Sequence, residues 1–230
     1  MQIEGVQKLT LLDFPGHVAC TVFTPGCNFR CPFCHNASLV VNAPAKGAQD
    51  PEELFRFLSK RRGILDGVAL TGGEPLLQQG VEEFLRRVKE LGFKTKLDTN
   101  GSFPDRLRAI LDAGLADYVA VDIKNSPAKY PLTTGCTADF TAQLSQTIKL
   151  LAQSGIDYEF RTTIVAEYHT DADILAMGEW INGAPRWFLQ KFEDSGELIC
   201  GGLHAADEET MNRFLQLAKP FVGHAALRGM

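Results

Sequence analysis

The chain has 230 residues, of which 45% are hydrophobic and 22% are charged, and this is enough apolar material for one compact domain with a sizeable core. Its 21 Gly and 11 Pro exclude a disordered, collagen-like or low-complexity chain. The formal net charge of -5 gives no electrostatic footprint for duplex nucleic acid or an anionic membrane, which favours a neutral or protein-like partner.

β-branched runs alternate along the chain with longer segments whose apolar residues have helical spacing. The predicted strands are His17–Thr24, Gly67–Thr71, Lys94–Asp98, Asp117–Ile123, Asp157–Val165 and Arg186–Gln190. The predicted helices are Pro51–Arg62, Gly80–Leu91, Pro104–Ala113, Asp139–Ser154, Asp171–Ile181 and Asp207–Ala218. Asp50 is the expected N-cap of the first helix, and glycines at 92, 114 and 155 stop three others.

Six strand-then-helix units predict a parallel α/β fold in a single domain over residues 1–230. An open doubly wound sheet and an incomplete barrel both fit this periodicity. Polar or glycine-rich segments follow the strands: TPGC, TGGEP, DTNG, DIKN and the Gln190 end of the sixth strand. Because the carboxyl ends of parallel strands form the site in both architectures, we expect these segments to converge on one mouth.

The sequence shows neither a membrane span nor a signal peptide, and this bears on the compartment that we expect for the protein. No stretch approaches the roughly 20 apolar residues of a membrane span, and the first residues lack a basic flank leading into an apolar signal core. We therefore expect a cytoplasmic protein that binds neither nucleic acid nor membrane.

Three of the six cysteines, Cys27, Cys31 and Cys34, lie within eight residues after the first predicted strand, unlike a secreted disulfide framework. Structural zinc usually takes four ligands in two separated pairs, and here only the adjacent His35 could supply a fourth. Three thiolates on a [4Fe–4S] cluster would leave one iron open for chemistry. We favour this cluster over zinc and over three buried, purely structural cysteines.

The pattern Cys27-x3-Cys31-x2-Cys34, with the aromatic Phe33, resembles the cluster motif of the radical S-adenosylmethionine (SAM) superfamily. The resemblance implies a (βα)6 partial TIM-type barrel with a parallel sheet. It implies that the three cysteines are the catalytic, metal-binding residues that hold a [4Fe–4S] cluster, whose unique iron chelates SAM. Reductive cleavage of SAM then gives methionine and a 5′-deoxyadenosyl radical.

Further segments resemble SAM-binding elements of this superfamily. Gly72, Gly73 and Glu74 are similar to its GGE element, which contacts the SAM amino group, although an isolated GGEP is also typical of a glycine turn. His35 directly after the cluster motif completes a CHN pattern, and it could bind SAM, a cluster sulfur or only its own loop. Phe33 is included among the predicted cofactor contacts.

The segments after the third and fourth strands are similar to those of glycyl-radical-enzyme activases. That similarity implies that Lys124, Asp122 and Asp98 surround the SAM carboxylate, and Asn100 is a further candidate contact. A monovalent cation could bind at Asp98, Thr99 and Asp122. Helix capping by residues 98–100 and a solvated ion pair between Asp122 and Lys124 are the structural alternatives.

Two strand residues complete the candidate site. Arg161 lies within an otherwise apolar strand, so it needs either a ligand or a structural ion pair. Gln190 ends the sixth strand where the pyruvate formate-lyase activator has a histidine that reaches SAM. Of the remaining cysteines, Cys20 is expected in the core, and Cys136 and Cys200 are expected as free thiols without a second cluster. The ferredoxin-like insertion of larger activases is replaced by a short loop over residues 37–50.

The resemblance runs from Leu11 to Gln190 and is strongest to single-cluster activating proteins of anaerobic ribonucleoside-triphosphate reductase. It implies that reduced flavodoxin or ferredoxin supplies an electron and that the adenosyl radical removes hydrogen from a backbone glycine of the reductase, giving a glycyl radical. Two alternatives remain open: a radical SAM enzyme acting on a small molecule or another peptide, and a non-enzymatic iron–sulfur or zinc scaffold.

Overall fold

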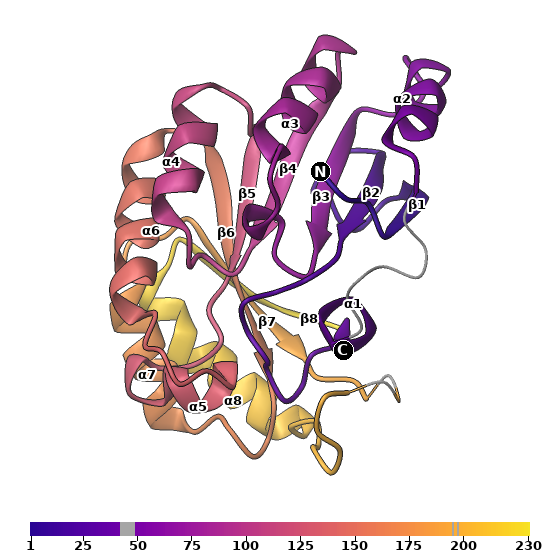
Figure 1. Ribbon diagram of the computed structural model, residues 1–230. Helices are drawn as coiled ribbons and strands as arrows, with labels where there is room; N and C mark the ends of the chain where they lie inside the picture. Colours follow the sequence, from indigo (N-terminus) through magenta and orange to yellow (C-terminus); the bar gives the residue numbers. More distant parts are fainter. Residues whose placement is uncertain (42–48, 195, 197) are drawn as a thin grey trace. The chain divides into compact units, whose positions relative to one another are not determined.

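The computed structural model describes residues 1–41, 49–194, 196 and 198–230, and Figure 1 shows its helices and strands. Two compact units make up the chain, which crosses between them several times. The first unit contains Met1–Asn28, Ser38–Thr99 and Phe103–Val119. The second unit contains Phe29–Ala37, Asn100–Ser102 and Ala120–Met230.

The sheet of the first unit has one antiparallel edge and a parallel interior. Its strands are β1 (Gly5–Thr10), β2 (Ala19–Thr24), β3 (Gly67–Gly72) and β4 (Lys94–Thr99). β1 pairs antiparallel with β2, whereas β2, β3 and β4 are parallel neighbours. Ala19 is in register with Gly67, and Gly67 with Lys94, so these three strands start level and end at one edge.

Helices with one apolar face connect these strands. They are α1 (Ala37–Val41), α2 (Pro51–Ser59), α3 (Val81–Glu90) and α4 (Pro104–Asp112), with a short 3-10 helix, η1 (Pro75–Leu77). Asp50 caps α2 as predicted, because its side chain accepts a 2.9 Å hydrogen bond from the Glu52 amide. Phe55 of α2 packs against Phe84 of α3 with ring centroids 5.5 Å apart. The apolar faces of α2 and α3 therefore help to build the core of this unit.

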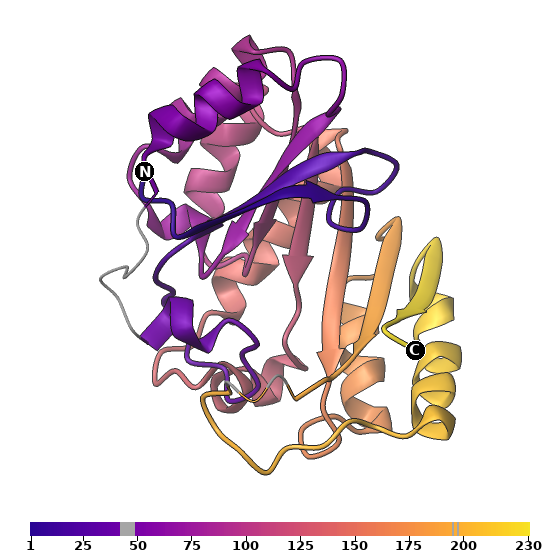
Figure 2. The same ribbon diagram turned by 90° about the vertical axis from the view of Figure 1, so that its right-hand side faces the viewer.

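β5 (Tyr118–Asp122) starts in the first unit and ends in the second. The later strands are β6 (Asp157–Ile164), β7 (Arg186–Lys191) and β8 (His224–Arg228), and β6, β7 and β8 are parallel. The helices of the second unit are α5 (Tyr130–Thr134), α6 (Thr141–Ser154), α7 (Asp171–Trp180) and α8 (Glu208–Ala218), with 3-10 helices η2 (Pro127–Lys129) and η3 (Lys219–Phe221). α8 packs along β7 and β8 (Figure 2).

The start of α7 is tied to the segment before α5. Thr170 and Asp173 form a capping box, each side chain bonding the backbone amide of the other. Asp173 is 5% exposed and also accepts hydrogen bonds from Ser126 Oγ at 2.8 Å and Lys129 Nζ at 2.6 Å. This carboxylate therefore joins two elements that are far apart in the sequence.

The six predicted strand-then-helix units and the α/β class are confirmed, and the expected stop glycines have left-handed backbone, with φ of 89° at Gly92 and 73° at Gly155. The prediction of six strands is corrected to eight within the described residues, because β1 and β8 also form. Both have partly exposed residues along their length and so lack the apolar run that marks an interior strand.

Two short helices also depart from the expectation. α1 occupies the start of the predicted 37–50 loop, and residues 42–48 of that loop lie outside the described residues. α5 has five residues, with a proline at the second position. A helix of this length is too short to show a periodic pattern of apolar residues in the sequence. None of the helices in the described ranges is long and apolar enough to cross a membrane.

Candidate active site

The loop after β2 carries Cys27, Cys31 and Cys34, and its first part is held by the first unit. The Gly26 amide donates to the Leu39 carbonyl at 2.8 Å, and the Gly26 carbonyl accepts from the Glu74 amide at 2.8 Å. The Gly73 amide also donates to the Thr24 carbonyl at 2.8 Å. The backbone immediately before Cys27 is thus fixed against the segment that follows β3.

The second unit holds the rest of the loop through α5. The Arg30 amide donates to the carbonyl of Thr134 at 2.8 Å, and the Phe29 ring packs edge-on against Tyr130 at 6.3 Å. α5 ends at Gly135, whose φ of 65° suits glycine, and a Cβ there would overlap the Arg30 carbonyl. α5 therefore holds the part of the loop that contains Phe29 and Arg30.

Cys31 and Cys34 lie on one tight turn, in which the Cys34 amide donates to the Cys31 carbonyl at 3.0 Å. Cys31 is buried, whereas Cys27 and Cys34 are partly exposed, and all three are free of disulfides. Across the described ranges, no group of three or more His, Cys, Asp or Glu side chains is arranged to hold a metal ion.

Gly72 and Gly73 allow two backbone segments to meet. Gly72 has a φ of 125°, and a Cβ on it would overlap the backbone of Thr24. A Cβ on Gly73 would overlap the Gly26 carbonyl. The two glycines of the GGE element are therefore required by close approach of the cysteine loop, whatever they contact in a ligand.

Glu74 is fully buried, with 0% exposure, and it has structural partners in the first unit. Its Oε1 accepts hydrogen bonds from the Leu76 amide at 2.9 Å and from Thr99 Oγ1 at 2.8 Å. The first bond caps η1 and the second joins the ends of β3 and β4. The predicted contact to a SAM amino group stays a prediction.

Asp98, at the end of β4, forms a buried ion pair with Lys96 two residues earlier. Residues two apart on a strand face the same side, so the pair is built into β4 itself. Lys96 is 1% exposed and was not among the predicted site residues. Because alternate residues of a strand face the same side, the predicted strand Lys94–Asp98 already implies that Lys96 lies beside Asp98, and this pattern could have identified Lys96 from the sequence.

Asp122, Lys124 and Arg161 form a linear ionic group in the second unit. Lys124 Nζ lies 2.9 Å from Asp122 Oδ2, and Arg161 Nε lies 2.9 Å from Asp122 Oδ1. All three side chains are at most 28% exposed. The structure thus brings together three predicted site residues, and the carboxylate between the two cations fixes both.

The pKa values of this group follow from its charges. Burial alone would raise the pKa of Asp122, but Arg161 and Lys124 hold it well below its usual range. Burial alone would lower the pKa of Lys124, but Asp122, together with smaller contributions from Cys31 and Cys34, raises it above its usual range. Lys124 is therefore a charged group within electrostatic reach of two of the three clustered cysteines.

His169, which the sequence analysis did not single out, contacts the backbone of Lys124. One of its ring nitrogens, Nε2, lies 3.0 Å from the Lys124 carbonyl, and Nδ1 lies 3.1 Å from the Val165 amide. The ring is 4% exposed, and its burial lowers its pKa. A neutral imidazole with Nε2 protonated satisfies both contacts, so His169 is a positioning residue for the backbone at Lys124.

The remaining predicted contacts have local packing roles. Asn100 Oδ1 accepts from the Ser102 amide at 3.0 Å within the loop, and this bond does not cap a helix, because the N-cap of α4 is Phe103 and has no side-chain cap. Phe33 is 3% exposed and packs 6.0 Å from the ring of Tyr168. His35 packs 5.7 Å from Phe192, and burial together with Lys124 lowers its pKa. Gln190 is partly exposed at the end of β7.

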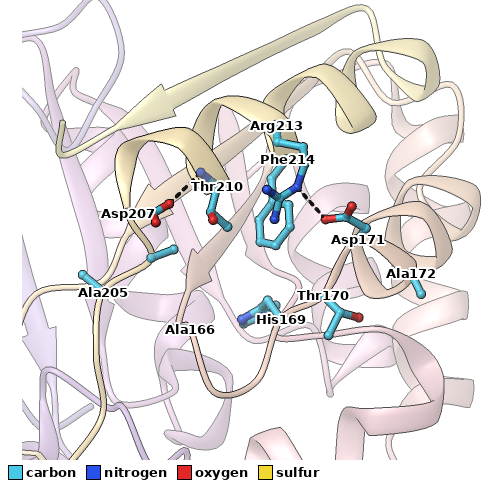
Figure 3. Close-up of a pocket in the computed structure, with 11 residues that line it drawn as sticks. Ala166, His169, Thr170, Asp171, Ala172, Ala205, Asp207, Thr210, Arg213 and Phe214 are labelled. Atoms are coloured by element: carbon cyan, nitrogen blue, oxygen red, sulfur yellow. Dashed lines mark hydrogen bonds and ion pairs between the residues drawn. The ribbon is translucent and has the colours of Figure 1, made fainter.

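A cavity of about 670 Å³ in the second unit lies where α7 and α8 begin (Figure 3). Arg213 Nε pairs with Asp171 Oδ1 at 3.0 Å across it, and Asp207 caps α8 by accepting from the Thr210 amide at 2.8 Å. His169 also lines this cavity. None of the predicted site residues does, so we place no ligand there.

The radical SAM superfamily model matches residues 21–181, more than half of the chain. The chain belongs to the radical SAM superfamily. Enzymes of this family use a [4Fe–4S] cluster and SAM, and a radical SAM enzyme is what the sequence predicted.

Curated relatives include activating enzymes. The chain is 28% identical over 232 residues to a protein of Methanocaldococcus jannaschii named provisionally as a glycyl-radical enzyme activating enzyme, which covers 98% of this chain and 95% of the relative. It is 31% identical over 150 residues to pyruvate formate-lyase-activating enzyme of Listeria monocytogenes, covering 60% of this chain and 59% of that one.

Solved structures of the superfamily share the fold. The Streptococcus suis protein SuiB bound to S-adenosylmethionine superposes with a TM-score of 0.64 at 16% identity, covering 91% of this chain and 52% of SuiB. The expected α/β partial TIM-type barrel is thereby confirmed. The chain spans only about half of SuiB, so this likeness concerns the radical SAM domain alone.

The donor set of this chain fits the family's cluster. Cys27, Cys31 and Cys34 lie on one short loop and are not in disulfides, and thiolates are the ligands of [4Fe–4S] clusters. The predicted monovalent cation fits less well, because Asp98 is already paired with Lys96, and Asp122 with Lys124 and Arg161.

Proposed function

We propose that this chain activates a glycyl-radical enzyme, with residues 1–230 acting as a single radical SAM domain in the cytoplasm. The observation that carries the proposal is the similarity to the Methanocaldococcus protein over 98% of this chain and 95% of that relative. Similarity to pyruvate formate-lyase-activating enzymes, such as the 34% identity over 129 residues to that of Clostridium pasteurianum, supports the same class.

In this proposal Cys27, Cys31 and Cys34 hold the [4Fe–4S] cluster. The bound cluster would supply the electron for cleavage of SAM to methionine and a 5′-deoxyadenosyl radical. Burial of Cys31 limits the access of water and oxygen to that part of the site. Thr134 and Tyr130 of α5 hold Arg30 and Phe29, the two residues immediately before Cys31.

Lys124 is the proposed contact to the SAM carboxylate. Its ammonium is held by Asp122, which Arg161 holds in turn, so a carboxylate ligand would meet a fixed positive charge. Glu74, carried between the Gly73 turn and η1, is the proposed acceptor for the SAM amino group. The other proposed SAM contacts are Phe33, His35, Gly72, Asp98, Asn100, Arg161 and Gln190.

The proposed substrate is a backbone glycine of an anaerobic ribonucleoside-triphosphate reductase, with reduced flavodoxin or ferredoxin as the electron donor. The similarity to proteins named as activators of glycyl-radical enzymes supports a protein substrate. No contact with nucleic acid or membrane is part of the proposal.

The test begins with anaerobic reconstitution with iron and sulfide, reduction by dithionite, and an assay for 5′-deoxyadenosine and methionine. Electron paramagnetic resonance after mixing with the reductase then shows whether a glycyl radical forms. SAM cleavage with no radical on the reductase, but with one on another glycyl-radical enzyme, would replace the partner. An intact reduced cluster that cleaves no SAM with any partner would contradict the enzyme assignment.

A further inference from the structure

Lys96 and Asp98 form an ion pair that is buried in β4. Lys96 is 1% exposed and Asp98 9% exposed, whereas Lys94 on the same strand is exposed. Lysine is almost never fully buried unless it is paired, because its ammonium loses its hydration. The burial of Lys96 is therefore tied to the carboxylate that it contacts.

The carboxylate of Asp98 is buried, so its negative charge has to be compensated by a nearby positive charge. It lies at the end of β4, next to Thr99, whose hydroxyl donates to the buried carboxylate of Glu74 at 2.8 Å. A buried carboxylate is strongly disfavoured unless a cation compensates its charge. Lys96 Nζ contacts Asp98 Oδ1, one of the oxygens that an alkali-metal ion would use.

We propose that Lys96 is the built-in cation of the Asp98 site and replaces a bound K⁺ or Na⁺. SAM binding by this protein is then independent of the alkali-metal ion in the buffer. With Lys96 neutralising Asp98, no alkali-metal ion is needed at this carboxylate. This inference rests on the proposed SAM site, and it deepens that proposal by naming the residue that sets its charge.

The experiment compares the cluster-loaded protein in choline chloride, NaCl and KCl at equal ionic strength. SAM affinity is measured by calorimetry, and the thermal unfolding midpoint is measured in the same three salts. We expect the wild-type affinity to change less than twofold between the salts, with no shift of its midpoint. A tenfold loss of wild-type affinity in choline would overturn the proposal.

The Lys96→Met variant removes the ammonium and keeps an unbranched side chain. We expect its SAM affinity in choline to fall at least tenfold and to recover at least fivefold in KCl or NaCl, while its unfolding midpoint rises with either salt. Equal values of both quantities in all three salts would overturn the proposal. Lys94→Met, an exposed change on the same strand, is the matched control and should behave as wild type.

Two further variants keep the test decisive. Lys96→Arg keeps the charge and should remain independent of the salt. Lys96→Met combined with Asp98→Asn removes both charges, so it should fold even if Lys96→Met alone does not, and its midpoint should not respond to alkali-metal ions. An alkali-metal response in this double variant would contradict the role of Asp98. If wild type binds no SAM, the proposed function fails, but the unfolding midpoints still decide the role of Lys96.

Discussion

The α-carbon of Gly73 faces the carbonyl oxygen of Gly26 so closely that a Cβ atom would overlap it. The same carbonyl accepts a hydrogen bond from the Glu74 amide. The contact joins the segment after β3 to the residue before Cys27. A side chain at position 73 would therefore push the cysteine loop away from the strand ends.

We expect Gly73→Ala to lower the free energy of unfolding by about 1–3 kcal/mol, as overpacking does in a tight core, and to impair SAM cleavage. Denaturant unfolding and the 5′-deoxyadenosine assay measure the two effects. Gly201→Ala is the control, because a Cβ there meets nothing within 4 Å and should be neutral. A fully stable and active Gly73→Ala variant would contradict the close approach.

Cys31→Ser should lose the visible absorption of the reconstituted cluster and all SAM cleavage, because a thiolate ligand is removed. Cys200→Ser is the matched control, since Cys200 is exposed and we assign it no ligand role. Iron and sulfide content, read with the absorption spectrum, distinguishes cluster loss from a defect in catalysis. Retention of a full cluster by Cys31→Ser would remove Cys31 from the ligand set.

Lys124→Ala should retain the cluster and bind SAM at least tenfold more weakly, because the fixed ammonium for the carboxylate is lost. The affinity is measured by calorimetry on the reconstituted protein. Lys149→Ala, an exposed change on α6, should leave it unaltered. Unchanged affinity in Lys124→Ala would indicate that the ionic group around Asp122 is structural only.

Asp173 gives the protein an acid-sensitive contribution to stability. Burial opposes its charge, but Lys129, Thr170 and Ser126 lower its pKa from 3.8 to about 2. Since the folded pKa lies below the unfolded one, the contribution is complete above about pH 4 and is lost as the pH falls towards about 2. We expect it to amount to about 2 kcal/mol.

Urea unfolding of wild type and Asp173→Asn between about pH 5 and about pH 3 tests this expectation. The variant should be less stable than wild type at the upper pH, and the difference should shrink as the pH falls. Asp105→Asn, an exposed change on α4, should show no such convergence. A constant difference would mean that Asp173 acts by packing alone.

Arg228 of β8 closes the far edge of the second unit. It donates two hydrogen bonds of 2.9 Å to Glu159, which is 1% exposed, and its guanidinium lies 3.4 Å from the Phe188 ring centroid. Arg228→Met should lower the free energy of unfolding by about 3 kcal/mol, because the buried Glu159 carboxylate loses both of its hydrogen bonds to Arg228. The double variant Arg228→Met/Glu159→Gln should regain much of the lost stability, because it no longer buries an uncompensated charge. If the double variant is no more stable than Arg228→Met, the loss comes from the contact between Arg228 and Phe188.

The sequence predicted the interior strands well because their residues are buried on both faces. β3 is a continuous run from Gly67, and the expected strand Gly67–Thr71 differs from it by one residue. β8 was missed because its side chains are only partly buried and its pattern resembles a loop. An edge strand is stabilised by the strand it pairs with, and a single sequence does not show which strands pair.

The candidate site was predictable where neighbours in sequence are neighbours in space. Asp122 and Lys124 were expected to face the same side, and they form an ion pair. The partner of Asp122 on its other oxygen, Arg161, lies 39 residues away, so the sequence left a ligand and an ion pair equally open. His169 approaches the Lys124 carbonyl across 45 residues and carries no local signal.

Phe29, Tyr130 and Trp180 form a row of aromatic rings from the cysteine loop to α7. Tyr130 packs edge-on against Trp180 with ring centroids 5.6 Å apart, and Phe29 packs edge-on against Tyr130 at 6.3 Å. The chain has only two tryptophans, and Trp187 is deep in the core. The fluorescence emission of Trp180 should therefore report how Phe29 of the cysteine loop packs on α5, and it can be measured before any iron is added.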